Sequence, residues 1–274
     1  MINTIKDGDG DMNTKSVKLG NTEISYFDIG EGKPIVLLHG FAGSKLYWEK
    51  VIPEFDDSHR VIVPDFPGHG DSRMGQEQYS IEEMADIIKE LLEYIGVSKV
   101  TMFGHSMGGY VTLAFADKYP ELLDGFSLVH STANSDSREA KAGRESNAKK
   151  VVEEGLDILI HGLAPKLFAP DNVEQCKDEI NQVKKIGLST SIKGTVNALL
   201  AMKERRERND VLENTDLPVL LVAGEYDQVI PPEKTFSVEK PNIEHHLIHG
   251  AGHMSMYEKP EELIKAMKQF LEKN

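Results

Sequence analysis

The chain reads Val100-Thr101-Met102-Phe103-Gly104-His105-Ser106-Met107-Gly108 at the point that decides its fold. The apolar run over 100–103 predicts a buried strand, and the pattern G-x-S-x-G over 104–108 follows it directly. A helical pattern then covers 107–119 and ends at Pro120. The chain must turn sharply between strand and helix, and glycines two before and two after Ser106 let the two elements approach closely. Such a turn exposes the serine hydroxyl beside a helix N-terminus.

Strand-like and helix-like segments alternate on both sides of this turn. A hairpin is expected where Gly20-Asn21 joins two alternating segments, and continuous apolar runs elsewhere suit strands covered on both faces. The expected strands cover 16–19, 22–27, 35–38, 61–63, 100–103, 126–129, 219–222 and 245–248. The expected core helices cover 81–95, capped by Ser80 and Glu83, 107–119 and 260–271. This alternation predicts an α/β fold with a mostly parallel sheet.

One long region interrupts the alternation, because no strand-like run occurs from 131 to 203. Apolar residues from Val151 to Leu163 predict one amphipathic helix there, and further helices are expected over 173–186 and 192–202. We therefore expect a helical insertion over 131–203 in an α/β core made of 16–130 and 204–274. The polar, Gly- and Asp-rich residues 1–15 are expected to form a flexible N-terminus.

Composition and charge exclude several classes of function. The formal net charge is −14, and an acidic surface repels phosphate backbones, so nucleic acid is not an expected partner. No apolar run reaches the roughly 18 residues of a membrane span, and the N-terminus lacks the features of a signal peptide. Cys176 is the single cysteine, so no intramolecular disulfide forms. We expect a cytoplasmic protein without a membrane partner, and the absence of known metal and cofactor motifs predicts neither group.

A nucleophilic serine needs a base, and the base needs an acid that orients it. Asp227 follows the strand expected at 219–222, and His253 follows the last strand in a Gly-Ala-Gly-His context. Both lie at carboxyl ends of strands, where open α/β sheets place their active sites. Glu225 competes with Asp227 as the acid, although the position three residues after Gly224 favours Asp227. Asp136 is a less well placed alternative.

Two backbone N–H groups are candidates for binding an oxyanion. One belongs to Met107, directly after the serine, and the other to Phe41 in the loop 39–43 that follows the strand at 35–38. His130 ends a strand next to the insertion, and we expect it to line the pocket or to cap the strand end. The remaining histidines are expected to be structural or solvated.

Together these motifs resemble the α/β-hydrolase fold superfamily in its form with a helical cap. The matching segments are 39–41, 65–72, 104–108, 224–227 with 229–231, and 250–253. The resemblance implies an eight-stranded, mostly parallel sheet with a cap after the sixth strand, and it implies Ser106 as nucleophile, His253 as base and Asp227 as acid. The segment 201–205 is similar to enol-lactonase and aryl-esterase branches. Serine at the elbow disfavours dehalogenases and epoxide hydrolases, which carry aspartate there, and no Gly-Gly-Gly loop of the hormone-sensitive-lipase type is present.

These features predict a serine hydrolase that cleaves small, largely uncharged carboxylic esters, thioesters or lactones through an acyl-enzyme. The apolar helix of the insertion is the reason to expect an uncharged substrate. Two alternatives stay open. The same three residues also suit C–C bond hydrolysis, perhydrolysis or a lyase reaction, and some relatives use the pocket to sense a ligand and signal to a partner protein.

Overall fold

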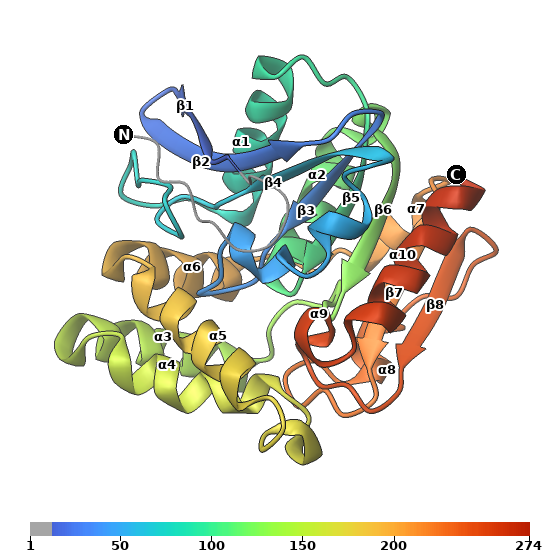
Figure 1. Ribbon diagram of the computed structural model, residues 1–274. Helices are drawn as coiled ribbons and strands as arrows, with labels where there is room; N and C mark the ends of the chain where they lie inside the picture. Colours follow the sequence, from blue (N-terminus) through green and yellow to red (C-terminus); the bar gives the residue numbers. More distant parts are fainter. Residues whose placement is uncertain (1–12) are drawn as a thin grey trace.

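A computed structural model describes residues 13–274, and it contains one eight-stranded sheet with the order β1-β2-β4-β3-β5-β6-β7-β8 (Figure 1). The strands are β1 (Lys15–Leu19), β2 (Thr22–Ile29), β3 (Lys33–Leu38), β4 (His59–Pro64), β5 (Val100–His105), β6 (Leu123–Val129), β7 (Val219–Gly224) and β8 (Ile243–Ile248). Strand β2 is antiparallel to β1 and β4, whereas β3 to β8 run parallel. The predicted fold class is confirmed. β1 begins at Lys15, one residue before the expected hairpin, and most of the N-terminus expected to be flexible, residues 1–12, lies outside the described residues.

Helices cover both faces of the sheet, which explains the continuous apolar strands. On β3, Val36 and Leu38 join one core with helices α1 (Ile81–Tyr94) and α2 (Met107–Lys118). Ile35 and Leu37, which alternate with them, join a second core with α10 (Pro260–Lys273). This two-residue alternation places every second side chain on the opposite face. The sheet is therefore packed against helices on both of its faces.

The ends of α1 follow the sequence expectation. Ser80 Oγ accepts a hydrogen bond from the Glu83 N–H at 3.1 Å, and the Glu83 carboxylate accepts one from the Ser80 N–H at 2.7 Å. This capping box satisfies two backbone donors that the first helical turn leaves unpaired. Gly96 ends the helix with a φ of 71°, a conformation that glycine adopts without strain.

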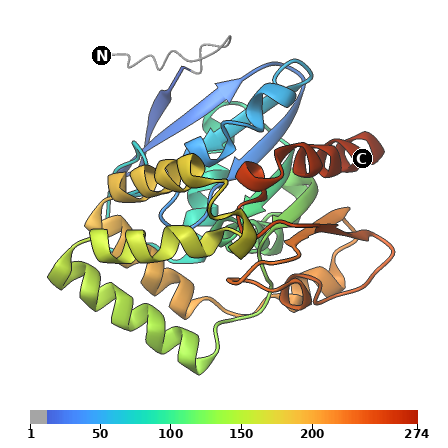
Figure 2. The same cartoon turned by 60° about the horizontal axis from the view of Figure 1, so that its bottom comes forward.

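Four longer helices lie between β6 and β7, and they gather side by side at one end of the sheet (Figure 2). They are α3 (Arg138–Glu154), α4 (Asp157–Leu163), α5 (Lys177–Ser189) and α6 (Ile192–Glu204). The prediction of one helix through 151–163 is wrong. Gly155 has a φ of 85° and ends α3, and a separate helix begins at Asp157. Val152 is 66% exposed, so the apolar residues of this stretch do not form a single buried face.

The inserted helices contact the core through a close backbone approach. A Cβ added to Gly68 would lie 2.6 Å from the Cα of Gly194 on α6, so neither position has room for a side chain. The Ser191 N–H also donates to the Gly68 carbonyl at 3.0 Å. Nearby, Asn197 Oδ1 accepts from the Tyr79 N–H at 2.7 Å. Glycine on both sides thus brings α6 against the loop that follows β4.

Short elements complete the described part of the chain. They are η1 (Lys45–Trp48), η2 (Ile52–Glu54), η3 (Pro120–Leu122), η4 (Ala164–Leu167), η5 (Pro170–Asn172), α7 (Asn209–Asn214), α8 (Pro232–Thr235) and α9 (Ser255–Glu258). Within residues 13–274, every helix is too short or too polar to cross a lipid bilayer.

Candidate active site

Ser106 occupies the sharp turn between β5 and α2. Its φ of 51° and ψ of −114° lie outside the regions that a serine normally adopts, and such strain is typical of functional positions. The turn is held by a hydrogen bond from the Ser106 N–H to the Val129 carbonyl at 2.9 Å and by one from Ser131 Oγ to the Ser106 carbonyl at 2.7 Å. A Cβ added to Gly108 would lie 2.6 Å from the Leu38 carbonyl oxygen, so the glycine is required for the close approach.

Asp227 and His253 meet behind this serine. They come from the loops after β7 and β8, and His253 Nδ1 lies 2.7 Å from Asp227 Oδ2. The other carboxylate oxygen accepts hydrogen bonds from the N–H groups of Val229 at 2.8 Å and Ile230 at 2.9 Å. These bonds hold the carboxylate in one orientation. Since Nδ1 of His253 is engaged by the carboxylate, Nε2 is the ring nitrogen that remains for a reaction partner.

The charge state of Asp227 follows from its surroundings. Burial alone would raise the pKa of this carboxyl, but the imidazoles of His253 and His130 outweigh burial and hold the pKa below its ordinary value. Asp227 is therefore a carboxylate at neutral pH. A carboxylate can only accept hydrogen bonds, so it requires the tautomer of His253 that carries its proton on Nδ1.

His130 lies behind the pair and not on the cavity at Ser106. It is fully buried, and it is not among the residues that line this cavity. Its Nδ1 lies 3.4 Å from Asp227 Oδ2, and its Nε2 lies 2.6 Å from Ser255 Oγ. Residue 130 has a φ of 49° at the end of β6, a backbone conformation that is uncommon for a residue other than glycine. The alternative expectation, a residue at the strand end, describes its place better.

His130, Asp227 and His253 are also the group of potential metal ligands within residues 13–274, with ligand atoms within 4.8 Å of one another. The 2.7 Å separation of His253 Nδ1 and Asp227 Oδ2 is a hydrogen-bond distance. His130 Nε2 is occupied by Ser255. The three side chains are thus already bonded within the protein, and we assign the group to a hydrogen-bond network.

The two residues whose backbone N–H groups are expected to bind an oxyanion are a chain neighbour of the serine and a residue of the cavity lining. Met107 is the first residue of α2, and Phe41 lines the same cavity as Ser106. A Cβ added to Gly40 would lie 3.2 Å from the Ser106 Cβ, which shows how closely the loop after β3 passes the serine. Neither N–H donates to a protein acceptor in the part of the chain that the structure describes.

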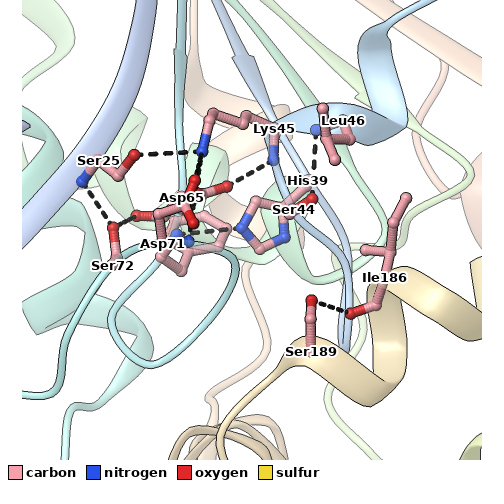
Figure 3. Close-up of polar contacts among 11 residues, drawn as sticks. Ser25, His39, Ser44, Lys45, Leu46, Asp65, Asp71, Ser72, Ile186 and Ser189 are labelled. Atoms are coloured by element: carbon pink, nitrogen blue, oxygen red, sulfur yellow. Dashed lines mark hydrogen bonds and ion pairs between the residues drawn. The ribbon is translucent and has the colours of Figure 1, made fainter. Parts of the chain in front are cut away.

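A buried ion pair between Lys45 and Asp65 holds the chain segment that follows β3 (Figure 3). Lys45 Nζ lies 2.7 Å from Asp65 Oδ2 and 2.7 Å from Asp71 Oδ2, and the Lys45 N–H donates to Asp65 Oδ1 at 2.6 Å. His39 Nε2 accepts from the Phe66 N–H at 3.0 Å. The motif over 65–72 therefore connects the loop after β4 with the loop after β3, and it positions the segment that carries the Phe41 N–H.

The two other acids considered for the site have different partners. Glu225 accepts a hydrogen bond from the Gly250 N–H at 2.9 Å and lies 3.4 Å from the exposed His249. Asp136 forms ion pairs with Arg144 and Arg205. The structure describes no contact of either carboxylate with the His253 ring.

A cavity of about 140 Å³ opens at Ser106 and His253. Its apolar wall is Leu159, Leu163, Leu167, Leu199, Met202 and Val229. Arg144 and Asn147, one turn apart on α3, also line it. Sequence reasoning missed these two residues, because α3 is polar along most of its length and its pattern does not indicate which residues turn inward.

The comparisons with known proteins agree with this geometry. A family model described as the alpha/beta hydrolase fold matches residues 33–260. The chain belongs to the α/β-hydrolase fold family. An esterase from Thermogutta terrifontis, solved with malate bound, matches this α/β hydrolase with a TM-score of 0.91 and 32% identity, over 94% of this chain and 98% of that one.

Two curated relatives show a similar extent of match. A 3-oxoadipate enol-lactonase 2 of Acinetobacter baylyi is 25% identical over 246 residues, which are 87% of this chain and 89% of the relative. A dihydrolipoyllysine-residue acetyltransferase component of an acetoin cleaving system from Pseudomonas putida is 27% identical over 269 residues, which are 95% of this chain and 70% of the relative. The family, with its esterase and lactonase members, identifies this α/β hydrolase as a hydrolytic enzyme.

Two buried histidines near the site make the free energy of unfolding of the α/β hydrolase depend on pH. Burial lowers the pKa of His39 and of His69 to about 3 in each case. His39 must also stay neutral because its Nε2 accepts the Phe66 N–H. Below about pH 6.5 each of these histidines binds a proton in the unfolded chain but stays neutral in the folded protein. As the pH falls from 6.5 to about 3, each histidine therefore lowers the free energy of unfolding by about 1.4 kcal/mol per pH unit.

We expect His69→Gln to flatten this pH dependence. The glutamine does not titrate, so the slope of unfolding free energy against pH should fall by about 1.4 kcal/mol per unit between pH 6 and 5. Urea unfolding at several pH values measures the slope. His161→Gln, at an exposed position on α4, is the control and should leave the slope unchanged. Equal slopes for His69→Gln and the parent protein would contradict the prediction.

Proposed function

We propose that this α/β hydrolase cleaves small carboxylic esters or lactones through an acyl-enzyme on Ser106. One observation carries the proposal: a serine in a strained turn shares a cavity with a histidine whose Nδ1 is bonded to a buried carboxylate at 2.7 Å. A histidine held in this way is suited to remove a proton from a neighbouring hydroxyl. The esterase and enol-lactonase relatives support the same class of reaction.

In the first half of the proposed reaction, Ser106 Oγ attacks the carbonyl carbon and its proton passes to His253 Nε2. Asp227 keeps the other ring proton on Nδ1 and stabilises the imidazolium. The N–H groups of Phe41 and Met107 bind the oxyanion, and each such donor is typically worth about 10²–10³ in rate. Collapse of the intermediate breaks the ester C–O bond, and the departing alkoxide takes the proton from His253.

In the second half, water attacks the acyl-serine while His253 accepts a proton from it. The acid is released and Ser106 regains its hydrogen, so that ester and water are converted to acid and alcohol. We further propose that residues 131–203 form a cap over this cavity, since Leu159, Leu199 and Met202 from the inserted helices line it. The cytoplasmic location expected from the sequence stays a prediction.

Covalent labelling tests the proposed nucleophile. A fluorophosphonate should modify the protein once, and mass spectrometry should place the adduct on the peptide that contains Ser106. Hydrolysis of p-nitrophenyl acetate and butyrate, measured in parallel, should stop in proportion to labelling. An adduct at another serine would overturn the assignment. Labelling at Ser106 without hydrolysis of any ester would favour the C–C hydrolase or sensing alternatives.

A further inference from the structure

The cavity at Ser106 contains one side chain with a permanent charge. Among the residues that line it, Arg144 is the single cation and no carboxylate is present, because the other lining residues are apolar or neutral polar. Arg144 comes from α3, whereas Ser106 and His253 come from the core. A substrate that reaches the serine therefore shares its cavity with a guanidinium group.

The guanidinium of Arg144 is held in place by the carboxylate of Asp136. Its Nε donates to Asp136 Oδ2, and its Nη2 lies 3.4 Å from Asp136 Oδ1, so one edge of the planar group faces the carboxylate. Its Nη1 donates to no residue of the described chain. Since Arg144 lines the cavity and one edge of its guanidinium is fixed, its remaining donor Nη1 can serve a second anion.

Asp136 does not neutralise the cluster, because it also pairs with Arg205. Arg205 Nη1 lies 2.8 Å from Asp136 Oδ1, and its guanidinium carbon stacks 3.9 Å above the ring of Tyr110. The side chains of Asp136 and Arg205 are only 6% and 4% exposed. Two guanidinium groups thus share one carboxylate, so the cluster carries one positive charge in excess, and Arg144 is its more exposed cation, with 23% of its side chain accessible. Such a charge favours an anionic ligand.

Resting on the function proposed above, we propose that the preferred substrates are esters that carry a carboxylate, which Arg144 binds while Ser106 attacks the ester carbonyl. Half-esters of short dicarboxylic acids, such as succinate, carry the required negative charge only a few bonds from the ester carbonyl. Hydrolysis of such a half-ester consumes one water and releases the dicarboxylic acid and the alcohol. This proposal differs from the expectation of a largely uncharged substrate, and the test below decides between them.

The test compares mono(p-nitrophenyl) succinate with p-nitrophenyl butyrate, which has a similar acyl length and no charge. The readout is the ratio of kcat/KM for the two esters. Arg144→Gln should lower this ratio at least 20-fold, mainly through a higher KM for the succinate ester. Arg144→Lys should lower the ratio less, because lysine keeps the positive charge. Asp136 remains paired with Arg205 in both variants, so no buried carboxylate loses all its partners. Arg206→Gln, at an exposed ion pair with Asp117, is the matched control and should leave the ratio unchanged.

A ratio that stays within threefold in Arg144→Gln would overturn the inference while the esterase function stands. If the parent protein hydrolyses neither ester, the proposed function fails, and binding of succinate then decides the inference separately. Calorimetry with Ser106→Ala measures that binding without turnover. Succinate binding that disappears in the Ser106→Ala, Arg144→Gln double variant would support an anion site at Arg144. Absence of binding, or binding that the second substitution does not change, would refute it.

Discussion

Ser106→Ala is expected to lower kcat for p-nitrophenyl acetate by about 10⁴- to 10⁶-fold. The alanine removes the oxygen that we propose as the nucleophile, while the proposed oxyanion donors and the cavity remain. Stability should change little, since Ser106 Oγ makes no hydrogen bond to another described residue and alanine faces the same strain at a φ of 51°. Steady-state kinetics and a thermal melt measure the two effects.

The matched control for this variant is Ser189→Ala on α5. Ser189 Oγ donates to the Ile186 carbonyl at 2.7 Å and does not line the cavity. The Ser189→Ala variant should retain the full activity of the parent protein. Equal activity of Ser106→Ala and the parent protein would show that another group is the nucleophile.

Asp227→Asn should reduce kcat by about 10⁴-fold with little change in KM. The Val229 and Ile230 N–H groups require an acceptor at Oδ1, so the new amide nitrogen must take the place of Oδ2 beside His253. A donor there forces His253 to accept on Nδ1 and to carry its proton on Nε2. In that tautomer Nε2 carries a hydrogen and has no lone pair to receive the proton of Ser106. A pH profile of kcat/KM would show the loss across the whole range.

Glu225→Gln tests the competing acid two residues earlier. Its carboxylate contacts the Gly250 N–H and the exposed His249, so the substitution should leave kcat within about threefold of the parent value. If Glu225→Gln lost activity and Asp227→Asn kept it, the acid would be assigned to the wrong residue.

His130→Asn should have an intermediate effect on kcat. It removes the ring that lies 3.4 Å from Asp227 and should cost less than the loss of the carboxylate.

Local chemistry explains why several elements could be predicted. The capping box of Ser80 and Glu83 and the turn glycine Gly96 act within a few residues of α1, so their effect is visible in the sequence. The turn at Ser106 is local as well, because its glycines are required by the adjoining strand and helix. The prediction failed where a single glycine interrupts a helical pattern. At Gly155 the positive φ ends α3, although the apolar periodicity continues beyond it.

The place of His130 could not be predicted for a different reason. Its partners, Asp227 and Ser255, lie 97 and 125 residues further along the chain. The sequence shows a histidine at a strand end, but it does not show that the ring lies against Asp227 and Ser255. That placement depends on how β6 and β7 pack, which no local pattern reports.

The sequence by itself determined the parallel α/β sheet, the turn that presents Ser106, and the loops that carry Asp227 and His253, because strand composition, turn glycines and chain order are local properties. Only the tertiary structure decided what surrounds the serine. The inserted helices have few constraints from periodicity, and the packing of α3 against α6 determines which of their side chains enter the cavity. Arg144 is the clearest case. Its role depends on Asp136, Arg205 and Tyr110 meeting in space, and contacts between distant residues arise from packing and not from spacing along the chain.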